Sequence, residues 1–250
     1  MKKSFLIALI SLVFAFGLYF NRAYSHIYDH ISNVHRVTPY TQTDMSISPK
    51  TGHTTKELVY VALGDSLTAG VGSDDFHTTF PYEFAEQIAE HDGVTVRLIN
   101  LGVPGARTAD VVRTQLPVVA SLNPDVITLL VGVNDMHGFV GKKVVAHEMQ
   151  TLLTALTRTT HAKILVMNIP FLGSRQLMYP PYQTFFDWQT NQYNEAITPF
   201  LTLSDVTFIN LYDNTKEYSQ SNQTYYSTDG FHPSAEGYHL WSAMLYANYR

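Results

Sequence analysis

The chain has 250 residues, of which 45% are hydrophobic and 15% are charged, a composition typical of a globular protein with a substantial core. Its formal net charge is −5 and its basic residues are scattered, which excludes the clustered Lys/Arg face of an electrostatic nucleic-acid binder. The absence of cysteine excludes disulfides, thiolate metal ligands and a cysteine nucleophile.

Residues 1–25 differ from the rest of the chain. Two lysines precede about seventeen residues, 4–20, that carry no charge, and the small residues Ala23 and Ser25 follow. This pattern fits a cleaved signal peptide, but the apolar run also reaches the lower limit for a membrane span, so a retained N-terminal membrane anchor stays equally open. Because the lysines favour the cytoplasmic side, both interpretations export the remainder, either secreted or anchored on the extracytoplasmic side.

Residues 26–56 are polar, rich in Thr, Ser and His, and show no apolar periodicity. Such a composition is typical of a tether between an anchor and a domain. We therefore expect a polar linker over 26–56 and a single folded domain over 57–250.

From Leu58 onward, short apolar segments rich in β-branched residues alternate with amphipathic stretches of helical periodicity. The expected strands cover 58–63, 94–100, 125–132, 163–169 and 206–210. Three expected helical faces consist of Phe80, Phe84, Ala85 and Ile88, of Val145, Met149, Leu152 and Leu156, and of Tyr238, Trp241 and Leu245. This alternation predicts an α/β fold, a three-layer α/β/α sandwich around a parallel sheet.

Polar residues follow the expected strands, at the edge where open parallel sheets place their functional sites. Ser66 follows the first strand, and Asp229 and His232 lie just ahead of the last helix. Ser66 can act as a nucleophile with His232 as its general base, and Asp229 can fix the tautomer of that imidazole. This combination points to acyl transfer.

Acyl transfer also requires hydrogen-bond donors where oxyanion charge develops. The backbone N–H groups of Ser66 and Gly102 and the side-chain amide of Asn134 are the expected donors. Each of these residues is also an ordinary turn former or helix cap when taken alone. Their order along the chain, each at its own strand end, favours a shared site.

Four stretches carry a family resemblance: GDSLTAG (64–70), NLGVPGART (100–108), GVND (132–135) and DGFHP (229–233). Together they resemble the four sequence blocks of the SGNH hydrolases, also called GDSL esterases and lipases, over roughly residues 58–248. The resemblance implies a flavodoxin-like five-stranded parallel sheet, ester or thioester substrates, and a Ser-His-Asp mechanism without cofactor or metal. The family's residues correspond to Ser66, Gly102, Asn134, His232 and the acid Asp229, with Asp65 and Asp135 in supporting positions.

Other functions stay open at this point. A metal-dependent phosphoesterase could use the carboxylate and imidazole ligand types of Asp65, Asn134, Asp135, His137, Asp229 and His232. An inactive surface module that binds carbohydrate is a third class. Within the esterase interpretation, the substrate is a lipid or short-chain ester, or an acetylated sugar cleaved by a carbohydrate O-deacetylase. The apolar residues of 171–186 either form a wall for an acyl chain or pack their loop onto the next helix.

Overall fold

The computed structural model describes residues 2–32, 44–50, 55–201 and 206–250. Its elements in chain order are α1 (Lys2–Ser32), β1 (Asp44–Ile47), β2 (Glu57–Gly64), α2 (Ser66–Ala69), the 3₁₀ turn η1 (Phe76–Thr78), α3 (Phe80–Asp92), β3 (Thr95–Asn100), α4 (Thr108–Asp110), the π-helical turn η2 (Val111–Gln115), α5 (Leu116–Leu122), β4 (Val126–Leu130), α6 (Val133–His137), α7 (Lys142–Thr159), β5 (Lys163–Met167), α8 (Tyr182–Leu201), β6 (Val206–Ile209), α9 (Leu211–Ser221) and α10 (Ala235–Tyr249).

The strands form one sheet in the order β1-β3-β2-β4-β5-β6. Strands β2 to β6 pair in parallel, which confirms the parallel α/β sheet that the sequence predicts. Every residue of β4 is buried, as expected for a central strand covered on both faces.

The sheet has one strand more than the five that were predicted. Strand β1 lies within 26–56, where the sequence indicated only a linker, and it pairs antiparallel with β3. Arg97 of β3 donates two hydrogen bonds, of 2.9 and 2.6 Å, to the Asp44 carboxylate, and Ile47 is buried against the core. The alternation of Met45 and Ile47 is too short a pattern to separate an edge strand from a linker.

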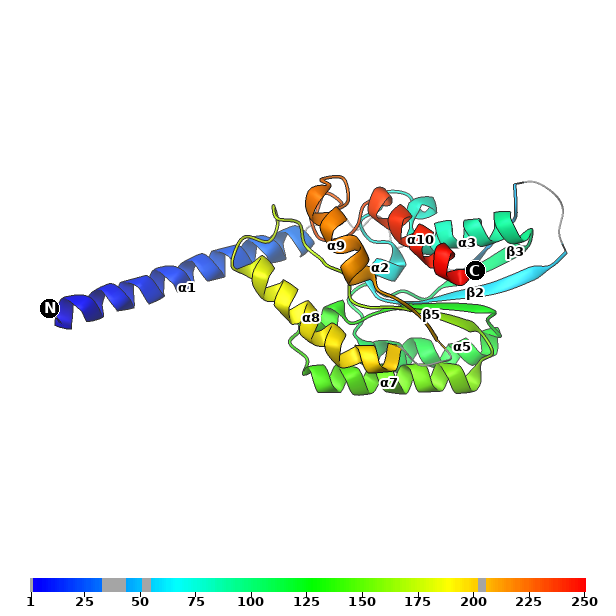
Figure 1. Cartoon of the computed structure of the whole chain (residues 1–250), viewed down its shortest axis with the longest axis horizontal. Coiled ribbons are helices and arrows are strands. Elements are labelled where there is room, and N and C mark those ends of the chain that lie inside the picture. Colours follow the sequence, from blue (N-terminus) through cyan, green and yellow to red (C-terminus); the bar gives the residue numbers. More distant parts are fainter. Residues whose placement is uncertain (1, 33–43, 51–54, 202–205) are drawn as a thin grey trace.

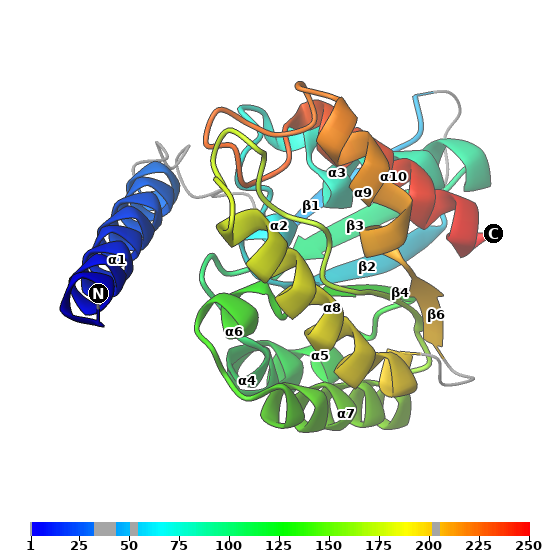
Figure 2. The ribbon, with the colours of Figure 1, turned by 60° about the vertical axis from the view of Figure 1, so that its left-hand side comes forward.

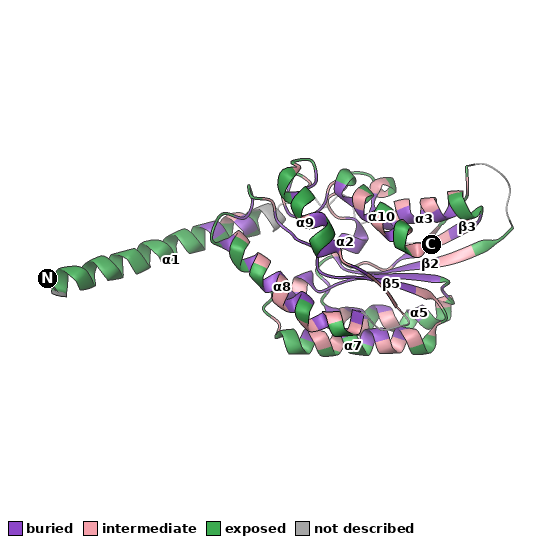
Figure 3. Ribbon diagram, in the orientation of Figure 1, coloured by how far each residue is buried: buried purple, intermediate pink, exposed green. Residues whose placement is uncertain are grey.

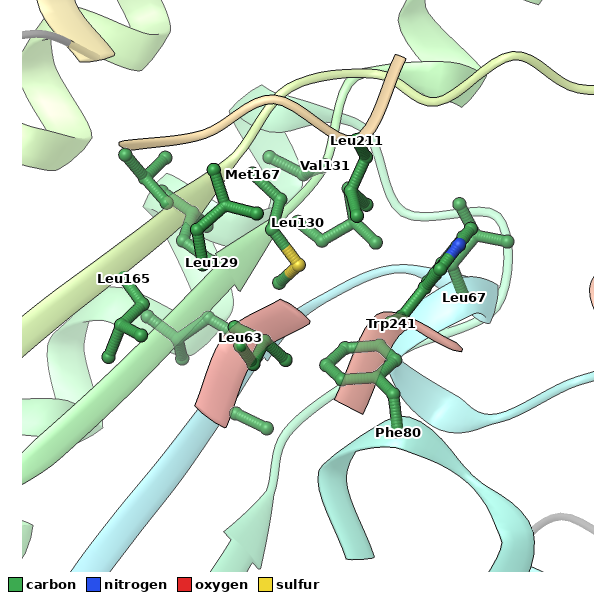
Figure 4. Packing of buried hydrophobic residues seen from close by; sticks show 14 of the residues in the cluster. Leu63, Leu67, Phe80, Leu129, Leu130, Val131, Leu165, Met167, Leu211 and Trp241 are labelled. Carbon is green, nitrogen blue, oxygen red and sulfur yellow. The ribbon is translucent and has the colours of Figure 1, made fainter. Parts of the chain in front are cut away.

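Helices cover both faces of this sheet (Figures 1 and 2). Helices α3, α9 and α10 lie on one face, and α5, α7 and α8 lie on the other. All the residues of the three predicted helical faces are buried, which confirms those helices. Figure 4 shows part of the core, where Trp241 of α10 lies beside Phe80 of α3 with ring centroids 6.0 Å apart.

Helix α1 projects from the domain, and most of its length is exposed (Figures 1 and 3). Among the described residues it is the one helix long and apolar enough to cross a membrane, over Lys3–Asp29 with a mean hydropathy of 2.0. Its last turns contact the domain, where Ala23 and Ile27 are each 5% exposed. The helix therefore includes both the apolar segment and the residues that dock on the domain.

Candidate active site

Ser66 is the first residue of α2, directly after β2. The neighbours of β2 are β3 on one side and β4 on the other, so β2 marks the point where the sheet order reverses, which is where open α/β sheets bind ligands. The side chain of Gln115 holds the strand end by accepting from the Gly64 N–H at 2.9 Å and donating to the Gly64 carbonyl at 2.8 Å. Asp65 caps α2 by accepting from the Leu67 N–H at 2.9 Å. The backbone that carries Ser66 is thus fixed on both sides.

His232 and Asp229 lie in the connection between α9 and α10 and meet Ser66 from across the rim. Oγ of Ser66 is 3.0 Å from Nε2 of His232, and Nδ1 of His232 is 2.6 Å from Oδ2 of Asp229. The other carboxylate oxygen accepts from the backbone N–H groups of Phe231 and His232 and from the Ser227 hydroxyl, at 2.7–2.8 Å. The structure brings the three residues together in one hydrogen-bonded series.

The turn at Gly230 makes this local pairing possible. Gly230 has a φ of +69°, a left-handed conformation that glycine adopts without steric cost.

Burial by itself raises the pKa of Asp229, but the hydrogen bond and charge of His232, together with the other donors, outweigh this effect. The pKa of Asp229 therefore lies below its ordinary value. An ionised carboxylate only accepts hydrogen bonds, so Nδ1 of His232 carries the proton and Nε2 faces Ser66 as an acceptor.

The three expected oxyanion donors differ in how they are engaged. Among the described residues, the N–H of Ser66 has no hydrogen-bond partner. The N–H of Gly102 donates to Oδ1 of Asn100 at 2.9 Å. Nδ2 of Asn134 donates to the Ala106 carbonyl at 3.0 Å. Two of the three donors are therefore already paired in the free protein.

Asn100 has a role that the sequence did not indicate beyond its position after a strand. Its side chain donates to the Thr68 carbonyl of α2 at 2.8 Å while accepting from Gly102. At Gly102 a Cβ would lie 2.5 Å from the Ala69 backbone nitrogen, which is closer than real contacts allow. The loop after β3 thus fits against α2 only with glycine at position 102.

Asp65 and Asp135 are buried near the site without a hydrogen bond to His232. Nδ2 of Asn134 lies 3.4 Å from the Asp65 carboxylate, and Asp135 accepts from both the N–H and the hydroxyl of Thr108, at 2.8 and 3.0 Å. Burial raises the pKa of Asp65 to about 7, and it raises that of Asp135 as well. Both side chains position the backbone segments that surround the site.

A series of aromatic rings runs from His232 to the N-terminal helix. Successive ring centroids lie 4.2–6.2 Å apart along His232, Phe231, His137, Phe186, Tyr182 and Phe20. Most apolar residues of 171–186 are buried, which favours the packing interpretation for that loop, and Phe186 reaches the site by stacking on His137. Burial, with a smaller contribution from His232, lowers the pKa of His137 to about 4, so this imidazole is neutral near pH 7.

Gln115 is a further residue at the site that the sequence did not indicate, since it contacts Gly64 from 51 positions away.

For the metal alternative, the described part of the chain has no group of three or more His, Cys, Asp or Glu side chains placed to hold an ion.

The sequence comparisons give one family match. A profile of the GDSL-like Lipase/Acylhydrolase family matches residues 62–240, from the end of β2 into α10. None of the curated proteins matches the chain significantly in sequence.

Several solved structures share the fold at low identity. A lipase from a goat rumen metagenome is 22% identical with a TM-score of 0.58, over 76% of this chain and 97% of that one. A lipase/acylhydrolase from Enterococcus faecalis is 22% identical with a TM-score of 0.62, over 76% and 94%. An acetylxylan esterase from Geobacillus stearothermophilus is 17% identical with a TM-score of 0.60, over 78% and 94%.

Proposed function

Because the chain belongs to the GDSL-like lipase/acylhydrolase family and is an ester hydrolase, we propose that it cleaves carboxylic esters or thioesters through an acyl intermediate on Ser66. The observation that carries the proposal is the hydrogen-bonded series from Ser66 through His232 to Asp229, with distances of 3.0 and 2.6 Å. This geometry meets the requirement that a nucleophile lie within hydrogen-bond reach of its base, and the base within reach of a group that orients it.

In the first step, Oγ of Ser66 attacks the acyl carbon while Nε2 of His232 takes the hydroxyl proton. The carboxylate of Asp229 stabilises the imidazolium that forms. Collapse of the tetrahedral intermediate breaks the bond to the alcohol or thiol, which leaves with the proton from His232. Water then attacks the acyl group by the same route, releasing the acid and restoring the Ser66 hydroxyl.

The oxyanion in each step receives hydrogen bonds from Ser66, Gly102 and Asn134. The Ser66 N–H is available at once because it has no partner among the described residues. Asn134 has a second amide hydrogen whose acceptor lies at 3.4 Å, a weak bond that the oxyanion replaces. The Gly102 N–H donates to the Asn100 side-chain oxygen in the free protein and turns to the oxyanion when the substrate reacts. Such a change of partner is in keeping with catalytic hydrogen bonds that form fully only in the reacting complex.

The test compares Ser66→Ala with Ser121→Ala, which removes an exposed hydroxyl on α5. We expect kcat on p-nitrophenyl acetate to fall by about 10⁴- to 10⁶-fold in Ser66→Ala and to stay unchanged in Ser121→Ala. A fluorophosphonate probe should add one adduct to the parent chain, mapped by peptide mass to Ser66. Turnover by Ser66→Ala close to the parent rate, or an adduct on another residue, would refute the proposal.

The acyl group and the alcohol require a separate measurement. A series of p-nitrophenyl esters from acetyl to palmitoyl, run beside acetylated xylan, separates a lipid-type esterase from a carbohydrate O-deacetylase. Both activities use the same steps on Ser66, so the series reports on the substrate and leaves the mechanism unaffected.

We also infer that α1 is a retained membrane anchor, with the domain on the extracytoplasmic side. The two lysines at the N-terminus favour the cytoplasm. The Tyr19 hydroxyl donates to the Pro180 carbonyl and the Tyr182 hydroxyl donates to the Phe20 carbonyl, each at 2.6 Å. A helix with these contacts is part of the folded protein.

A further inference from the structure

The apolar part of α1 is short, and its end is already in contact with the domain. The uncharged residues 4–20 form about 26 Å of helix at about 1.5 Å per residue, against a hydrocarbon core of about 30 Å. Tyr19 and Phe20, in the last turn of this run, make the hydrogen bonds to the segment that begins α8. Because the last turn of the apolar run itself contacts the domain, the domain surface beside α1 lies at the level of the lipid headgroups.

Three aromatic side chains are exposed on this part of the domain, and we call them the aromatic surface: Phe139, Phe185 and Trp188. They are 62%, 36% and 58% exposed. The Phe139 and Phe185 ring centroids are 6.3 Å apart, and those of Phe185 and Trp188 are 6.0 Å apart. Phe185 also contacts Phe186 at 5.4 Å, which joins the aromatic surface to the ring series that ends at Phe20 of α1.

The elements that carry these residues lie on the side of the domain from which α1 extends. Phe139 lies in the short connection between α6 and α7, and Phe185 and Trp188 lie in the first two turns of α8. Figure 1 shows the start of α8 beside the end of α1, and Figure 2 shows α6 and the start of α8 on that side. Exposed aromatic side chains cost free energy in water but suit the membrane interface.

We propose that the aromatic surface inserts into the headgroup region of the bilayer that α1 crosses. The partner of the aromatic surface is the lipid bilayer. Ring contacts join the aromatic surface to α1, a helix whose length and composition suit a membrane span. The inference rests on the proposed retention of α1. It also holds the rim that bears Ser66 close to the lipid, so that esters dissolved in the membrane can reach it without crossing water.

The two tryptophans of the chain provide a direct test. Trp188 is 58% exposed, whereas Trp241 is completely buried in the core. The full chain is reconstituted into phosphatidylcholine vesicles whose acyl chains carry bromine near the headgroup end. We expect tryptophan fluorescence to fall by about a third to a half relative to vesicles without bromine, because an interfacial indole touches the quencher. Bromine near the chain terminus should quench less.

Three variants complete the experiment. Trp188→Phe should abolish the quenching, because only the buried Trp241 remains. Phe139→Ser should reduce it, whereas Val118→Ser, which replaces a residue 41% exposed on α5, should not. The measurement is repeated in Ser66→Ala, so its result does not depend on hydrolysis. Flotation of the vesicles shows whether the chain is bound to them. If the chain floats with the brominated vesicles and the fluorescence of Trp188 is not quenched, the inference is wrong, whatever the outcome for Ser66.

Discussion

Asp65 is a carboxyl group buried without a cationic partner, and this affects how stability depends on pH. Burial raises its pKa from 3.8 to about 7, with Asp135 adding a smaller Coulombic contribution. The folded chain therefore binds more protons at this site than the unfolded chain between these two values. The stabilising contribution of Asp65 is fully present below pH 3.8 and is lost as pH rises through about 7.

Asp65→Asn should remove this pH dependence while keeping the side-chain oxygen that caps α2. Between pH 5 and pH 8, we expect the Tm of the parent to fall by roughly 5 °C more than that of Asp65→Asn. The measurement is thermal unfolding of the full chain in detergent, followed by circular dichroism. Asp74→Asn, which removes an exposed carboxylate, serves as the control and should follow the parent. Parallel curves for all three chains would contradict the assigned role of Asp65.

At the scale of elements, the site depends on how closely the loop after β3 approaches α2. The Thr68 and Ala69 backbone of α2 meets the Gly102 backbone and the Asn100 side chain at this contact, two residues beyond Ser66. Because Cβ at position 102 would lie 2.5 Å from the Ala69 nitrogen, a larger residue must move one element away from the other. Such a shift changes the packing and displaces the Gly102 N–H, which is one of the proposed oxyanion donors.

Gly102→Ala should therefore reduce both stability and catalysis. We expect a loss of about 1–3 kcal/mol in unfolding free energy from overpacking, and a fall in kcat of about 10²-fold from the displaced donor. The matched control is Gly141→Ala, where the nearest side-chain atom to the new Cβ is 3.9 Å away. Denaturant unfolding and p-nitrophenyl acetate kinetics on both variants measure the two effects. Full activity in Gly102→Ala would exclude this N–H as a donor.

The comparison of sequence and structure follows the same division into elements. The buried parallel strands were predictable because their apolar runs are continuous and their order places Ser66, Asn134 and His232 at one edge. Strand β1 was not, because edge pairing depends on Arg97 and Asp44, a contact between distant residues. The engagement of Gly102 by Asn100 was likewise hidden, since a motif identifies a donor but not its partner in the free protein.

On the scale of the whole molecule, the N-terminal helix and the site form one continuous structure. The ring series joins Phe20 of α1 to His232 through the start of α8. Removing α1 would expose the faces of Tyr182 and of the neighbouring residues that the helix covers. The sequence alone left a signal peptide and an anchor equally open, because both need only an apolar run after positive charge. The contacts of Ala23 and Ile27 with the domain favour the anchor.

Retention of α1 is the last prediction, and it follows from where a processing enzyme would have to cut. The small residues that resemble a cleavage site, Ala23 and Ser25, lie inside the helix, and Ala23 is 5% exposed. Proteolysis favours exposed, locally unfolded chain, so cleavage of the folded protein at this point would require α1 to leave the domain and unwind. When the full chain is expressed in a host with a secretory pathway, we expect it in the membrane fraction after alkaline carbonate extraction, with an intact mass that includes residues 1–25. The N-terminal lysines place the domain on the extracytoplasmic side of the membrane. A protease added to intact cells, after any envelope layer outside this membrane has been removed, should therefore digest the domain. A soluble product that begins near residue 26 would show that docking does not protect the helix, and the proposed anchor would then be wrong.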